Sequence, residues 1–173
     1  MSNYWDLIDQ DTPGRRNDVT PVFSDIEAFR SLLSDLEELA AGEEFGAIVG
    51  IDALGFILGA AFAIHVGKPF VPIRKGGKLP VDVEQERFVD YSGEPKVLEI
   101  REGALSGFEK VALIDEWIET GSQVMASIKL IERQGAEVAL VLAINVDMNE
   151  QTRRLMDKYK IRAIAMDSVR PAG

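Results

Sequence analysis

The sequence predicts an α/β fold: a mostly parallel sheet flanked by helices, within a single domain that spans residues 1–173. Short apolar runs rich in β-branched residues alternate with helical patterns. The length of 173 residues suits one domain, and 46% hydrophobic against 28% charged residues is typical of a globular protein. Strands alternating with crossover helices form parallel sheets that are covered on both faces. Ligands bind such sheets beyond the carboxyl ends of the strands, so we expect the site there.

The expected elements follow in chain order. Ser24 or Asp25 can cap a first helix, IEAFRSLLSDLEELA, which carries apolar residues along one face. A buried strand at Phe45–Ile51 precedes a small-residue helix near Gly55–Val66. Further strands are expected at PFVPIRK, KVLEI, KVALI (residues 110–114), VALVLAIN and IRAIAM, with later helices at 123–134 and 149–159.

The stretch from Lys75 to Gly107 interrupts the alternation of strands and helices. It mixes Gly, Pro and charged residues around the single strand KVLEI. A long polar excursion in a compact domain can be a mobile functional flap or a plain surface hairpin, and both alternatives remain open. We define the expected flexible loop as residues 76–107, approximately.

Composition excludes several classes of function. The formal charge of −10 repels nucleic-acid phosphates, so no nucleic-acid partner is expected. No apolar run is long enough to span a membrane, and the amino terminus does not resemble a secretory signal. The chain has no cysteine, and the cytoplasm is the expected compartment. His65 is the only histidine, so a histidine-rich metal site is excluded and a helix-end role is expected.

The most informative segment is VALIDEWIETGSQ, residues 111–123. An apolar strand ends in Asp115 and Glu116, and after a short loop Thr120-Gly121-Ser122 opens a helix. Carboxylates at a strand's end can accept hydrogen bonds from a diol or hold a metal ion. Backbone N–H groups and hydroxyls at a helix start can bind a phosphate. Taken alone, the same pattern also fits a capped helix that follows two solvated acids.

This segment resembles the signature of type I phosphoribosyltransferases, which bind phosphoribosyl pyrophosphate (PRPP): an apolar strand, two acids and a TG phosphate loop. GIDALGFILGAAFAIHVGKPFVPIRKGGKLP (residues 50–80) resembles the adenine phosphoribosyltransferase family across its length. DVTPVFSDIEAF (residues 18–29) resembles that family's early DITP segment, and Asp90-Tyr91 followed by VLEI resembles its flexible catalytic loop. The resemblance covers most of the chain in the family's order.

The resemblance implies a role for each matching position. Asp115 and Glu116 would bind the ribose hydroxyls, and the loop of Glu119, Thr120, Gly121, Ser122 and Gln123 would wrap the 5′-phosphate. The residues that would bind the pyrophosphate are Asp52, Ala53, Leu54, Arg74, Lys75 and Lys78. The three cations among them could supply their charge within the chain or across a dimer interface. Asp90 would be the acid of the catalytic loop. A hood over the base, formed by residues 1–22 and the carboxyl-terminal segment, would include Arg16 and Asn17.

Three positions depart from the adenine enzymes. Leu54 replaces an arginine that binds pyrophosphate, and Asn17 replaces another that Arg15 or Arg16 could substitute. The phosphate loop reads ETGSQ in place of ATGGT. Its Glu119 resembles the acid of hypoxanthine-guanine phosphoribosyltransferases that faces the purine N7, so it could exchange a proton with the base, or it could turn to solvent.

The resemblance thus implies a purine phosphoribosyltransferase that forms a nucleoside 5′-monophosphate and pyrophosphate, with adenine favoured over 6-oxopurines. Magnesium would be bound through PRPP rather than by the protein directly, and the chain would form a homodimer. Leu54 and the altered loop also fit a non-catalytic sensor of PRPP or a nucleotide, and an enzyme with a non-purine acceptor remains open. Trp117 could pack under the loop or stack near the base.

Overall fold

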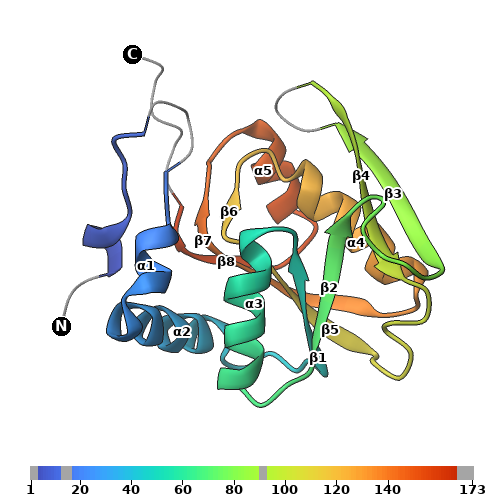
Figure 1. Cartoon of the computed structure of the whole chain (residues 1–173), viewed down its shortest axis with the longest axis horizontal. Coiled ribbons are helices and arrows are strands. Elements are labelled where there is room, and N and C mark those ends of the chain that lie inside the picture. Colours follow the sequence, from blue (N-terminus) through green and yellow to red (C-terminus); the bar gives the residue numbers. More distant parts are fainter. Residues whose placement is uncertain (1–3, 13–16, 90–92, 167–173) are drawn as a thin grey trace.

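The fold is a mostly parallel eight-stranded sheet with helices on both faces, in a computed structural model that describes residues 4–12, 17–89 and 93–166 (Figure 1). The helical elements are η1 (Tyr4–Leu7), α1 (Thr20–Ser24), α2 (Ile26–Ala40), α3 (Leu54–His65), α4 (Ser122–Arg133) and α5 (Glu150–Met156). The strands are β1 (Ala47–Ile51), β2 (Phe70–Lys75), β3 (Val83–Val89), β4 (Pro95–Arg101), β5 (Lys110–Ile114), β6 (Trp117–Ile118), β7 (Glu137–Val146) and β8 (Ile161–Ala165). The predicted fold class is confirmed.

The order of the strands places the ends of β1, β2 and β5 side by side. The sheet runs β3-β4-β2-β1-β5-β7-β6, and β8 also pairs with β7. The pairs of β1 with β2 and β5 are parallel, as are those of β7 with β5, β6 and β8. The pairs of β4 with β2 and with β3 are antiparallel. The carboxyl ends of β1, β2 and β5 therefore meet at one edge of the sheet.

Two hydrophobic layers follow from the two-residue alternation of the strands. On β1, Val49 and Ile51 face a layer that α4 and α5 complete with Ile128 and Leu155. Ile48 faces the opposite layer, which α2 and α3 complete with residues such as Leu36 and Phe62. Because β1 is buried on both faces, its sequence reads as a continuous apolar run rather than an alternating one.

Helix α2 shows how a predicted element forms. Of the two candidate caps it is Asp25 that caps it: the carboxylate accepts hydrogen bonds from the backbone N–H groups of Glu27 and Ala28, both at 3.0 Å. Its apolar stripe packs against the sheet, with the innermost residues Leu32 and Leu36 fully buried. No described helix is long and apolar enough to cross a membrane.

The interrupting stretch forms an antiparallel hairpin of β3 and β4, at the end of the molecule opposite α1 and α2 (Figure 1). Glu86 of β3 forms ion pairs with Lys129 of α4 at 2.9 Å and with Arg133 of α4 at 2.8 Å. These contacts join the hairpin to the helical layer. The sequence analysis expected one strand here and missed β3, and the flexibility expected of residues 76–107 stays a prediction.

Candidate active site

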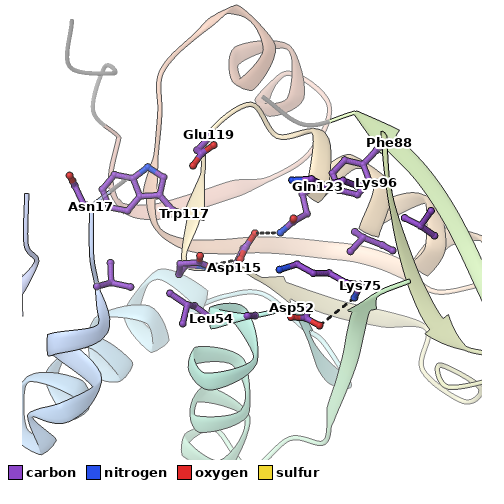
Figure 2. A pocket seen from close by; sticks show the side chains of 15 residues that line it. Asn17, Asp52, Leu54, Lys75, Phe88, Lys96, Asp115, Trp117, Glu119 and Gln123 are labelled. Atoms are coloured by element: carbon purple, nitrogen blue, oxygen red, sulfur yellow. Dashed lines mark hydrogen bonds between the residues drawn. The ribbon is translucent and has the colours of Figure 1, made fainter. Parts of the chain in front are cut away.

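A cavity of about 260 Å³ lies at the carboxyl ends of β1, β2 and β5, where the sequence predicts the site (Figure 2). The amino-terminal arm, the loops after β1 and β5, the start of α4, and the hairpin all contribute to its wall. The lining residues are Asn17, Val19, Asp52, Ala53, Leu54, Lys75, Phe88, Lys96, Val97, Leu98, Asp115, Glu116, Trp117, Glu119 and Gln123. Nine predicted site residues are therefore brought together in one cavity.

Asp115 is the most buried acid of this cavity, with 3% of its surface exposed. One carboxylate oxygen accepts a hydrogen bond from the backbone N–H of Glu116 at 3.0 Å, and the other accepts one from the Gln123 amide at 3.2 Å. Burial, and then the negative charge of Glu116, raise the pKa of Asp115 well above its usual range. Because burial destabilises its charged form, the Asp115 carboxylate is stabilised by a ligand that brings positive charge or donates a hydrogen bond to it.

The predicted phosphate loop turns directly into α4. Gly121 has a positive φ of +75° and is the N-cap residue of α4, and the first helical N–H, that of Ser122, lies 3.4 Å from the Thr120 hydroxyl. The hydroxyls of Thr120 and Ser122 lie 3.0 Å apart. Backbone N–H groups at a helix start favour an anion. Thr120, Gly121 and Ser122 line a neighbouring cleft of about 370 Å³, while Glu119 and Gln123 line the main cavity.

The loop after β1 brings a second helix start to the cavity. The peptide bond between Asp52 and Ala53 is cis, and α3 begins at Leu54 without a side-chain cap. A Cβ on Gly55 would lie 3.0 Å from the Ile114 carbonyl oxygen and 3.1 Å from a carboxylate oxygen of Asp115, so glycine favours this close approach of α3 to the acid. Leu54, which stands where the adenine enzymes carry an arginine, lines the cavity with an apolar side chain.

Lysines of β2 and β4 supply the positive charge of the cavity. The Lys75 side chain extends toward Asp115 (Figure 2), and Lys96, which lies opposite Phe88 in the β3–β4 pair, lines the same cavity. The sequence analysis missed Lys96. The strand that carries Lys96 was predicted, but its sequence, PKVLEIR, has no charge alternation that would direct Lys96 at the site.

Two other predicted pyrophosphate ligands, Arg74 and Lys78, do not line the cavity. The Arg74 guanidinium donates a hydrogen bond to the Lys78 carbonyl oxygen at 3.2 Å and lies 4.0 Å from the Asp52 carboxylate. In this arrangement Arg74 connects two loops. Of the remaining predicted residues, Asp90 and Arg16 lie outside the described residues.

The amino-terminal arm contributes Asn17 and Val19 to the wall opposite the hairpin. Trp117 lies beside Asn17 in Figure 2, and its indole N–H donates a hydrogen bond to Asp147 at 2.8 Å. The indole thus lines the cavity in a fixed orientation. Glu119 lines the same cavity, while its backbone carbonyl accepts a hydrogen bond from the Asn149 amide at 2.7 Å.

The described residues hold no cluster of three or more His, Cys, Asp or Glu side chains that could hold a metal ion. His65 is the last residue of α3, and its ring lies 2.8 Å from the Glu37 carboxylate, remote from the cavity residues.

Comparisons with known proteins give a consistent result. No protein-family model matches the chain. It is 36% identical over 149 residues to adenine phosphoribosyltransferase of Thermotoga neapolitana, covering 85% of this chain and 86% of the relative. It is 42% identical over 121 residues to that of Roseobacter denitrificans, covering 70% and 68%. The crystal structure of adenine phosphoribosyltransferase from Thermoanaerobacter pseudethanolicus superposes with a TM-score of 0.86 at 30% identity, covering 94% of this chain and 97% of the other.

Proposed function

The chain belongs to the adenine phosphoribosyltransferase family, and we propose that it forms AMP and pyrophosphate from adenine and PRPP. One observation carries the assignment to this cavity. The buried acid Asp115, the phosphate-loop residue Gln123 and the cation Lys75 converge at the carboxyl ends of three adjacent parallel strands. This arrangement offers separate partners for a diol, a phosphate and a pyrophosphate.

We assign the ribose hydroxyls to Asp115 and Glu116. Each hydroxyl donates a hydrogen bond, and each oxygen of the buried Asp115 carboxylate, which accepts one hydrogen bond already, has a further lone pair to accept it. The 5′-phosphate would then lie against the start of α4, where backbone N–H groups and the hydroxyls of Thr120 and Ser122 can donate hydrogen bonds to it. Binding at both ends fixes the anomeric carbon between them, which lowers the entropic part of the barrier.

The leaving pyrophosphate would lie between the start of α3 and Lys75. In the reaction the bond from the anomeric carbon to the pyrophosphate oxygen breaks and a bond to an adenine nitrogen forms, so negative charge grows on the leaving group. Lys75 and the uncapped N–H groups near Leu54 are placed to stabilise that charge. Lys96 adds a second cation on the same side of the cavity.

We propose that Mg²⁺ enters with PRPP. The carboxyl oxygens of Asp115 and Glu116 are the hard ligands that Mg²⁺ accepts, and they can bind its coordinated waters or the diol beside it. When bound, the ion would neutralise charge on the pyrophosphate. We also propose a cytoplasmic location, the compartment of nucleotide synthesis.

The acceptor base would lie near Asn17 and Trp117, on the side of the anomeric carbon opposite the pyrophosphate. Glu119 lines this part of the cavity and is placed to take the proton that the base loses on bond formation. An acid there also suits a 6-oxopurine, so the four common purines need separate testing.

A second candidate function is PRPP or nucleotide binding without transfer. Leu54 favours it, because an apolar side chain lines the cavity where a cation would stabilise the leaving group. The loss of that cation is expected to slow the transfer step more than it weakens binding.

The test is pyrophosphate release from Mg²⁺-PRPP, with adenine, hypoxanthine, guanine and xanthine offered separately. We expect release with adenine, and AMP as the second product. Release with a 6-oxopurine alone would reassign the base. If calorimetry shows PRPP binding but no base leads to pyrophosphate release, the second candidate function, binding without transfer, would be favoured over the enzyme.

We further propose a homodimer that uses the outer face of α3. This helix is apolar around its circumference, and Ile57 and Ile64 are 45% and 83% exposed. A helix that is apolar on all sides is expected to be covered on all sides. A second copy of the chain would cover this face.

A further inference from the structure

A buried glutamate outside the cavity holds the turn that follows β2. We propose that Glu99 is a positioning residue that fixes the Gly76–Leu79 turn so that Lys78 is presented to the pyrophosphate. The inference rests on the proposed function and on the sequence-based prediction that Lys78 binds the pyrophosphate. Lys78 does not line the cavity, so its side chain would reach the pyrophosphate from the turn outside it.

Glu99 is the most buried charged residue of the described chain, with 1% of its surface exposed. One carboxylate oxygen accepts hydrogen bonds from the backbone N–H groups of Lys78 and Leu79, both at 2.7 Å. The other accepts one from the Gly77 N–H at 2.8 Å and one from the Gln85 amide at 3.1 Å. Three consecutive residues of one turn therefore donate to a single side chain.

The carboxylate is held in its charged form. Burial opposes the charge on Glu99, but the N–H groups of Gly77, Leu79 and Lys78 together outweigh it and lower the pKa below its ordinary value. Hydrogen bonds to a charged acceptor are shorter and stronger than neutral ones. The turn is therefore fixed more firmly than a surface loop of this length would be.

The other polar group of the Lys78 backbone is also held. Its carbonyl oxygen accepts a hydrogen bond from Arg74 at 3.2 Å, and the Arg74 guanidinium lies 4.0 Å from the Asp52 carboxylate. Arg74 and Glu99 lie directly opposite each other in the β2–β4 pair. Asp52 belongs to the loop that lines the cavity, so these contacts connect the turn to the pyrophosphate end of the site.

The two glycines allow the turn to close over Glu99. Gly77 has a φ of +76°, which residues with a side chain rarely adopt. A Cβ on Gly76 would lie 2.9 Å from the Cβ of Val97 on β4. The sequence KGGK is thus shaped to place three N–H groups on one carboxylate, and the lysine side chain remains exposed.

Glu99→Gln keeps the size of the side chain but changes one acceptor into a donor. The new amide N–H₂ faces either the Gly77 N–H or the pair from Lys78 and Leu79, so at least one backbone donor loses its acceptor. Gln85 can reverse its own amide and adapt, but a backbone N–H cannot. The turn is expected to loosen while β4 stays paired.

The experiment compares two ligands that differ in the pyrophosphate. In Glu99→Gln we expect the affinity for PRPP to fall about 10- to 100-fold, as small misplacements of a positioned group do, and the affinity for AMP to change less than about 2-fold. Glu84→Gln on the neighbouring strand is the matched control, since it removes the same charge without backbone donors, and both affinities should stay unchanged. Equal losses for PRPP and AMP, or no loss for either, would overturn the inference.

A double-mutant cycle tests whether Glu99 acts through Lys78. Once Lys78→Ala is present, Glu99→Gln should cost little further PRPP affinity. Additive losses, or a Lys78→Ala variant that binds PRPP normally, would overturn the positioning role. Should Glu99→Gln fail to fold, Glu99→Asp enters the same cycle, because it keeps the charge but withdraws the carboxylate by one methylene. Turnover of adenine by the unsubstituted chain tests the proposed function separately.

Discussion

Gly121→Ala probes the phosphate loop at its most constrained point. Gly121 has a φ of +75°, and a Cβ there would lie 2.7 Å from the Cδ2 of Leu155, a residue that is 4% exposed. The left-handed backbone costs alanine about 1–2 kcal/mol, which the lower entropy of the unfolded chain offsets by about 0.4–1 kcal/mol. Displacing a packed leucine adds about 1–3 kcal/mol. The free energy of unfolding should therefore fall by about 1–5 kcal/mol, with a central value of about 3 kcal/mol.

The matched control is Gly135→Ala, at the other end of α4. Gly135 has a φ of +84°, but its Cβ would meet nothing within 4 Å. It carries the backbone cost alone, and its stability should fall by about 1 kcal/mol or less. In thermal unfolding we expect Gly121→Ala to lower the Tm by about 5–15 °C, and Gly135→Ala by no more than about 4 °C.

A Leu155→Ala background isolates the contact between the loop and α5. With the leucine truncated, Gly121→Ala should cost about 1 kcal/mol, a coupling of about 1–3 kcal/mol. Because the shifted loop also misdirects its N–H groups, Gly121→Ala should raise KM for PRPP while Gly135→Ala leaves it unchanged. Equal Tm losses in the two alanine variants would refute the reasoning.

The remaining predictions concern the cavity and the dimer. Asp115→Asn should bind PRPP and AMP more weakly yet unfold at a higher Tm at neutral pH. Because the pKa of Asp115 is raised in the folded protein, the wild type loses stability as pH rises through that folded pKa, and the asparagine variant does not. The gain in Tm should therefore vanish below about pH 4, where the wild-type carboxyl is protonated in the folded and the unfolded chain. Leu54→Arg should tighten PRPP binding about 10-fold without affecting AMP in calorimetry, and an equal change in both would reject a pyrophosphate neighbour. Glu119→Gln should slow turnover far more than it weakens PRPP binding, and an unchanged rate would remove its proton-transfer role. In sedimentation velocity Ile64→Glu should yield monomer while Ile26→Glu, at the other strongly exposed isoleucine, stays dimeric; a dimer in both would exclude the α3 face.

The central sheet could be predicted from the sequence because its strands are buried on both faces. The strand of residues 110–114 is found with its predicted bounds, and the strand predicted at 45–51 begins two residues later. Strand β3 was missed for the opposite reason. VEQERFV is partly exposed along its length. Its acids form ion pairs with Lys129 and Arg133 of α4, which lie more than 40 residues later in the chain. No local periodicity reports such a partner.

The candidate site divides along the same line. Asp115, Glu116 and Gln123 could be placed from the sequence, because a strand end followed by a helix start fixes their direction within a few residues. Lys96 and Phe88 could not, because their entry into the cavity depends on how the hairpin folds over the sheet edge. Arg74 shows that charge alone does not define a ligand. Its guanidinium connects the turn after β2 to Asp52, so its substitution should disturb pyrophosphate binding through Lys78 rather than through a lost direct contact.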